Sequence, residues 1–203
     1  MTEQPTPSPQ EEKRRFFRIE DLAHLTCTVL DDAAFAEKTA LLEKGVSGEF
    51  LMLSDLAAIT SDMAVTLHKI EAFNPEVADY LKSLDKKIDL IGQTLMSGEF
   101  GVDTDAATEL SLSASGLAMQ TRQKFTRGAN LEIKMVLLPD HVGILAYGQV
   151  VNIEPGSAAD TSLVRVDFTH IRDADRDVLI RHIMRKQGEM LRERRHARER
   201  GEG

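Results

Sequence analysis

The sequence predicts an α+β protein in which a small antiparallel β-sheet or β-barrel is interrupted by a helical insertion and closed by a C-terminal helix. Two observations lead to this prediction. Residues 107–172 form short segments of alternating apolar and polar residues, separated by turn signals, as expected for antiparallel strands. Residues 54–97 instead repeat apolar residues at steps of three and four, which is the spacing of one face of a helix.

The composition indicates a packed cytoplasmic protein that does not bind DNA and does not insert into a membrane. Hydrophobic residues make up 42% of the 203 residues, which is enough for a core. The net charge of -8 would repel the phosphates of duplex DNA, and the absence of Trp argues against a stacking platform for single strands. We see neither a secretion signal nor an apolar run long enough to cross a bilayer.

The chain starts with a polar, proline-rich tail, residues 1–12, for which we expect no fixed structure. An arginine-rich arm follows, in which Arg14 and Arg18 form an RxxxR pattern around Arg15. A guanidinium binds phosphate with two hydrogen bonds and matches the O6/N7 edge of guanine, so the arm suits a guanine nucleotide. Taken alone, such a cluster is more often plain solvated charge.

We assign the arm and the first strand to residues 13–30. The single cysteine, Cys27, excludes an internal disulfide, and its apolar surroundings favour a core position over a nucleophilic one. Residues 31–44 have a helical composition with weak periodicity, and we place a helical insertion over residues 31–106.

Two apolar stripes in the insertion predict helices over about 54–73 and 75–97, joined where Asn74 caps and Pro75 starts the second helix. The stripes consist of Leu56, Ile59, Met63, Thr66, Ile70 and Phe73, then Val77, Leu81, Leu84, Ile88, Ile91 and Leu95. They could pack against each other within one chain. An inserted hairpin has little core to rest on, however, so we favour a homo-oligomer formed through Leu56–Leu95.

The remaining strands are expected over residues 107–172 and the closing helix and a basic tail over residues 173–203. The predicted strands cover 110–119, 129–138, 142–153 and 162–168, and the helix covers 173–195. The tail from Arg192 to Arg200 is interpreted as a solvated, frayed helix, with contact to an anionic partner as the alternative.

A serine- and glycine-rich pattern, Ser111-x-Ser113-x-x-Gly116, lies among these strands. Hydroxyl groups and a glycine let a backbone approach a polar ligand closely, although an ordinary turn would have the same composition. The sequence shows no metalloprotease, nucleophile-elbow, P-loop or dinucleotide-binding motif. We therefore predict a binding protein without catalytic residues, metal or cofactor.

Together, the RxxxR arm, the later pattern, the strands and the closing helix resemble the PilZ family, and residues 167–187 look like its last strand and helix. The resemblance implies a six-stranded barrel that binds cyclic di-GMP. By this resemblance, Arg14 and Arg18 would hold the guanines and phosphates of the ligand, with Arg15 as a neighbouring contact. The other wall would be lined by Ser111, Ser113 and Gly116.

The chain departs from the family pattern in two ways. Ser111 stands where the family has Asp or Asn, and a long insertion separates the two motifs. Such an insertion resembles the atypical, tetramer-forming branch, in which helices with heptad repeats assemble the subunits. We predict a cyclic di-GMP sensor that signals to a partner protein which the sequence does not identify. The alternative is an oligomeric structural adaptor with a degenerate ligand site.

Overall fold

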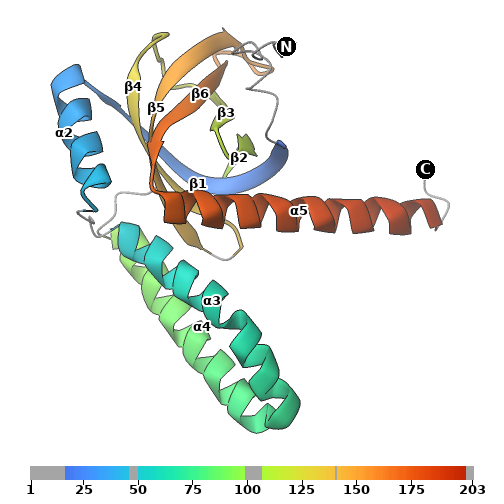
Figure 1. The fold of residues 1–203 in the computed structure, drawn as a ribbon. Helices are drawn as coiled ribbons and strands as arrows, with labels where there is room; N and C mark the ends of the chain where they lie inside the picture. Colours follow the sequence, from blue (N-terminus) through green and yellow to red (C-terminus); the bar gives the residue numbers. More distant parts are fainter. Residues whose placement is uncertain (1–16, 46–49, 99–106, 140, 200–203) are drawn as a thin grey trace, which may run out of the picture.

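Six antiparallel strands form a closed barrel in the computed structural model, which describes residues 17–45, 50–98, 107–139 and 141–199. The strand order around the barrel is β1-β2-β3-β6-β5-β4 (Figure 1). The strands are β1 Ile19–Leu30, β2 Thr108–Ser113, β3 Gly116–Thr121, β4 Asn130–Leu137, β5 Val142–Pro155 and β6 Ser162–Ile171. The predicted α+β class and antiparallel barrel are confirmed.

Alternation along each strand fills the barrel with apolar side chains. On β2 and β6 the inward residues Leu110, Leu112, Val164 and Val166 are all at most 2% exposed. On β1 the inward row carries Ile19 and Ala23 but also Asp21, which is 8% exposed. A buried carboxylate between two apolar neighbours needs partners, and these come from the closing helix.

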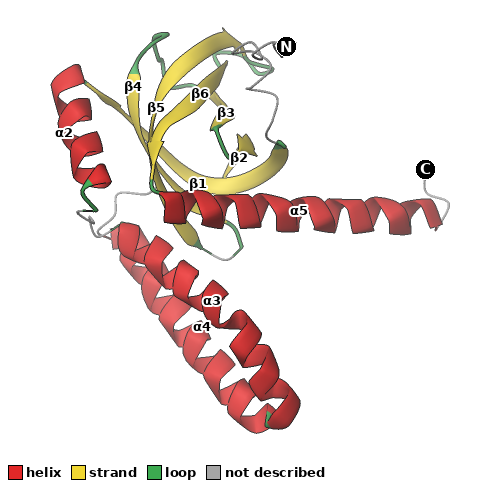
Figure 2. Ribbon diagram, in the orientation of Figure 1, coloured by secondary structure: helices red, strands yellow, loops and turns green. Residues whose placement is uncertain are grey.

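The closing helix, α5 Asp173–Glu199, seals one end of the barrel. Val178, Leu179 and Ile183 belong to the same core cluster as the inward strand residues. Figure 2 shows α5 running beside β1 and continuing beyond the barrel. Its second half is therefore more exposed, and Leu191 is 58% accessible.

The segment predicted as one strand over 110–119 consists of two strands, β2 and β3, paired with each other. A turn at Ala114 and Ser115 separates them. The apolar residues Leu112 and Leu117 are five positions apart, an odd step that would put them on opposite faces of one strand. The turn restores both to the barrel interior.

Three helices lie between β1 and β2, where two were predicted: α2 Asp32–Glu43, α3 Leu51–Phe73 and α4 Pro75–Gly98. The bounds of α3 and α4 agree closely with the predicted helices. The additional helix α2 covers the outer face of β4 and β5, forming a second apolar cluster. Its buried members are Leu42, Phe50, Val136, Leu145 and Tyr147.

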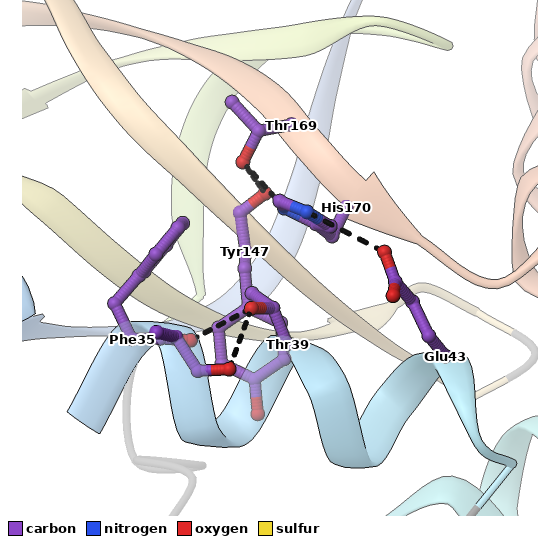
Figure 3. A network of polar contacts seen from close by, with 7 residues as sticks. Phe35, Thr39, Glu43, Tyr147, Thr169 and His170 are labelled. Atoms are coloured by element: carbon purple, nitrogen blue, oxygen red, sulfur yellow. Dashed lines mark hydrogen bonds and ion pairs between the residues drawn. The ribbon is translucent and has the colours of Figure 1, made fainter. Parts of the chain in front are cut away.

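Polar and aromatic contacts fix α2 to the barrel (Figure 3). The Phe35 ring meets Tyr147 edge-on at 6.0 Å between centroids and His170 at 5.9 Å. Beneath them, buried Glu132 pairs with Lys38 at 2.5 Å and accepts a hydrogen bond from the Tyr147 hydroxyl at 3.2 Å. Burial, together with the charge of Glu132, raises the pKa of Tyr147 far above its ordinary value.

Helices α3 and α4 form a hairpin that projects away from the barrel (Figure 1). The side chain of Asn74 caps α4 by accepting a hydrogen bond from the Val77 amide at 3.2 Å. Several large apolar side chains of the hairpin remain exposed in the single chain. The exposed fractions include Ile59 61%, Met63 54%, Ile88 45% and Ile91 61%.

Among the described residues, two ion pairs join the hairpin to α5 and to Arg172, the residue that directly precedes it. Arg172 contacts Asp55 of α3 at 3.0 Å, and Arg181 lies 3.9 Å from Asp62. Arg172 also forms two hydrogen bonds, at 2.8 and 2.9 Å, with Asp175, which is fully buried. The bonds with Asp175 raise the pKa of Arg172, so this side chain stays charged at the junction of the barrel, α5 and the hairpin.

Candidate functional site

Arg18, the last arginine of the arm, lies at the start of β1, next to the end of β2. Arg18 is exposed and directly precedes Ile19, which pairs with Leu112. The antiparallel register therefore brings Arg18 beside Ser113, although the whole helical insertion separates them in sequence. Arg14 and Arg15 lie outside the described residues.

Ser111 lies on the outer surface of β2 and is partly exposed. Its neighbours across the sheet are Glu20 of β1 and Ala118 of β3. Ala118 is 5% exposed, so Ser111 is the more accessible of these two neighbours. The serine hydroxyl is thus the accessible polar group of the pattern, on the same outer face as the start of β1.

Ser113 has a different role in the geometry. Its hydroxyl donates a hydrogen bond to the carbonyl oxygen of Gly116 at 3.0 Å and lies 3.4 Å from the hydroxyl of Ser115. Ser113 is only 1% exposed. Because its hydroxyl hydrogen is already used inside the turn, Ser113 shapes the loop between β2 and β3. It could only accept a hydrogen bond from a ligand, through the lone pairs of its oxygen.

Position 116 requires a glycine because β3 and β6 approach each other closely there. A Cβ atom added there would lie 2.2 Å from the carbonyl oxygen of Val166 on β6. Any side chain at this position would push β3 and β6 apart. The glycine of the pattern thus holds the turn against β6, where the Phe168 amide also donates to the carbonyl of Ser115 at 2.8 Å.

Helix α5 contacts both sides of this site, which the sequence analysis did not foresee. Arg176 donates a hydrogen bond to the carbonyl of Ala114, in the turn, at 2.8 Å. Asp21 of β1 contacts His182 at 2.5 Å and Lys186 at 3.0 Å. One signal was available, since Asp21 occupies an inward position between Ile19 and Ala23, where a carboxylate requires partners.

Burial raises the pKa of Asp21, but the hydrogen bonds from His182 and Lys186 outweigh that effect and leave the pKa below its ordinary value. The carboxylate is therefore ionised at neutral pH. The contacts of Asp21 with His182 and Lys186 join β1, at a position three residues after Arg18, to the middle of α5.

Cys27 is largely buried, and desolvation raises the pKa of its thiol to about 12. At neutral pH it is a neutral thiol, which is a poor nucleophile. Among the described residues, no three His, Cys, Asp or Glu side chains gather in a way that could hold a metal ion. Within the same residues, no helix combines the length and apolar character needed to span a bilayer.

The comparisons identify the barrel region. Residues 94–185 match the model of the PilZ domain, which confirms the predicted resemblance. PilZ is a family that binds cyclic di-GMP. The matched segment includes Ser111, Ser113 and Gly116, whereas the arginine arm lies before it, on the other side of the insertion.

The chain is also similar to several solved structures, among them the following two. A tetrameric PilZ domain protein from Xanthomonas campestris, self-assembled through a helical bundle, has a TM-score of 0.57 and 13% identity, covering 88% of this chain and 91% of that one. It shares the fold. An inhibitor of motility from Bacillus subtilis has a TM-score of 0.37 and 21% identity over 41% of this chain and 43% of that one. No curated protein matches the sequence.

Proposed function

We propose that this chain, whose residues 94–185 form a PilZ domain, is a cytoplasmic cyclic di-GMP-binding effector that signals to a partner protein rather than catalysing a reaction. The supporting observation is the register that brings Arg18 to the Ser111–Gly116 turn. Two motifs from opposite sides of the insertion then form one site, with cationic groups on one side and hydroxyl and backbone groups on the other.

The chemistry of the ligand fits such a site. Cyclic di-GMP carries two phosphates and two guanines, and guanidinium groups bind both with paired hydrogen bonds. Arg14, Arg15 and Arg18 would close over the ligand, while Ser111 faces a guanine from the sheet. A ligand that orders the arm changes the surface next to β1 and can thereby favour or exclude a partner.

Titration calorimetry with cyclic di-GMP tests this proposal. Arg18→Ala removes a charge-assisted contact and should weaken binding about ten- to a hundredfold. Arg127→Ala is the matched control, because Arg127 is an exposed arginine in the loop between β3 and β4, at the other end of β3 from Gly116. Equal affinities of wild type and Arg18→Ala would refute the assigned site.

A second candidate function is an oligomeric structural adaptor with a degenerate ligand site. Ser111 favours it, because a serine replaces the Asp or Asn of the family pattern. If the wild type releases no heat with millimolar cyclic di-GMP, the sensor proposal fails and the adaptor takes its place.

We further propose that the insertion, residues 31–106, assembles copies of this chain. The exposed apolar side chains of α3 and α4 support this, since a stable hairpin would bury them against a partner. The related Xanthomonas protein is described as a tetramer held by a helical bundle. A homotetramer is therefore our working assembly.

A further inference from the structure

We propose that α5 fixes the distance between the two walls of the ligand site, with Arg176, His182 and Lys186 as positioning residues that do not touch the ligand. This inference rests on the proposed function, because it assigns a role within the same site. It arises from the contacts that α5 makes with both motifs.

The first wall is the turn between β2 and β3. Its residue Ala114 is 3% exposed, and its carbonyl oxygen accepts a hydrogen bond from Arg176 at 2.8 Å. A buried carbonyl without a donor is costly, and a charged donor makes a short, strong bond. Arg176 therefore holds the turn that carries Ser113 and Gly116 against the closing helix.

The second wall is the start of β1. Asp21 is buried three residues after Arg18, and both its oxygens are bound by α5, one by His182 and one by Lys186. Arg185 lies 3.3 Å from Nδ1 of His182. The two ring nitrogens of His182 face different partners, Nε2 facing Asp21 and Nδ1 facing Arg185. The strand that leads into the arginine arm is thus tied to α5 by a directed pair.

A single rigid element carries both attachments. Arg176 and His182 are six residues apart, which is about 9 Å along a helix. Between them, Leu179 is fully buried in the barrel core and prevents α5 from sliding. Since a site held close to its bound geometry loses less free energy on binding, the helix pre-organises the two walls for the ligand.

The test of the first wall uses Arg176→Met, Arg176→Lys and a control on the same helix. Arg176→Met keeps the apolar stem and removes the donor, so cyclic di-GMP should bind about tenfold more weakly. Arg176→Lys restores a charged donor and should recover most of the affinity. Arg181→Met removes the contact of α5 with Asp62 of α3, away from both walls, and should bind like the wild type.

The second wall is tested by Lys186→Met, which removes one of the two partners of Asp21 while His182 remains. We expect a several-fold weaker affinity. Ligand-free thermal unfolding is measured for every variant. A loss of affinity in Arg176→Met and Lys186→Met that Arg181→Met does not share, measured well below the melting temperature of every variant, supports positioning rather than general destabilisation.

The two proposals fail in different ways. If the wild type binds and Arg176→Met binds equally well, the positioning role is overturned and the proposed function stands. If the wild type does not bind, the proposed function fails, and amide hydrogen exchange without ligand decides on α5. Exchange at Ser115 and Gly116 must then be faster in Arg176→Met than in Arg181→Met, and equal rates overturn the inference.

Discussion

Two glycines let β6 pass close to both neighbouring strands. A Cβ at Gly116 would lie 2.2 Å from the carbonyl of Val166, and a Cβ at Gly148 would lie 2.4 Å from the carbonyl of Asp167. The two carbonyls belong to consecutive residues of β6, approached from opposite sides. The glycine of the ligand pattern thus has a packing role besides any contact with a ligand.

Gly116→Ala should therefore destabilise the barrel by about 1–3 kcal/mol, because two backbones must separate.

Gly188→Ala is the opposite case. Gly188 lies inside α5, and a Cβ atom added there would lie 3.6 Å from the side chain of Arg192, an ordinary contact distance. Alanine should therefore stabilise the helix by about 0.5–1 kcal/mol. Urea unfolding measures both, and a Gly116→Ala variant as stable as the wild type would contradict the packing argument.

The departure from the family pattern at Ser111 can be removed by mutation. Ser111→Asn would give the outer face of β2 an amide that reaches farther than a hydroxyl and pairs with a guanine edge, without adding negative charge near the phosphates. We expect tighter binding of cyclic di-GMP, by about threefold to tenfold in calorimetry. Thr108→Asn, at the far end of β2 and on its inward-facing row, serves as control. Unchanged affinity in Ser111→Asn would argue against the assigned register.

Asp21 should make the stability depend on pH. Its pKa is lowered in the folded protein, so the unfolded chain binds the proton more readily. Its contribution is therefore complete above the ordinary range near pH 4 and is lost as the pH falls through the lower, folded value. The difference in unfolding free energy between wild type and Asp21→Asn should shrink below about pH 4. A difference that stays constant down to pH 2.5 would contradict this.

At the scale of elements, the strength of the periodic signal decided what the sequence could predict. Helix α4 follows its apolar stripe, and its bounds agree with those predicted within a residue. Helix α2 has a weak stripe because it buries few residues, Thr39 and Leu42 among them. Its position depends on contacts such as Phe35 with Tyr147 and His170, which are distant in sequence and leave no local pattern.

The site was predictable in part for the same reason. Ser111, Ser113 and Gly116 form a compact motif, and Arg18 belongs to another. The two motifs lie close together only because β1 pairs with β2 across the insertion. This proximity was expected from the family resemblance and not from the local sequence pattern. Arg176 and Lys186 gave no signal, since cations on a helix are ordinarily solvated. Their roles follow from the orientation of α5, which only the packing of Leu179 into the barrel reveals.

The apolar surface of the hairpin predicts a change of assembly. Ile88→Asp introduces a charge where oligomer formation would exclude water, at a cost of several kcal/mol, and should yield smaller particles in sedimentation. Ile88 is 45% exposed in the single chain, so the fold of the protomer should survive. Lys87→Asp, at an exposed position one residue away, is the control and should leave the assembly intact. A monomeric wild type would show that the hairpin needs no partner.

At the scale of the whole molecule, the architecture depends on pattern more than on particular residues. The Xanthomonas protein shares the fold over 88% of this chain at 13% identity. Apolar periodicity and turns are enough to specify such an arrangement, since cores tolerate wide substitution at constant pattern. The angle between the barrel and the hairpin, in contrast, is not set by the apolar pattern. It depends on particular pairs such as Arg172 with Asp55, which no periodicity predicts.

The barrel and the hairpin should therefore be separable in function. The proposed ligand walls belong to β1 and to the turn between β2 and β3, whereas the hairpin of α3 and α4 projects away from the barrel (Figure 1). Arg18→Ala should bind cyclic di-GMP about ten- to a hundredfold more weakly and sediment like the wild type. Ile88→Asp should sediment as smaller particles and bind cyclic di-GMP with the wild-type affinity, within about twofold. A loss of affinity in Ile88→Asp protomers that remain folded would mean that a neighbouring copy completes the site, which would place the ligand at a subunit boundary instead of within one barrel.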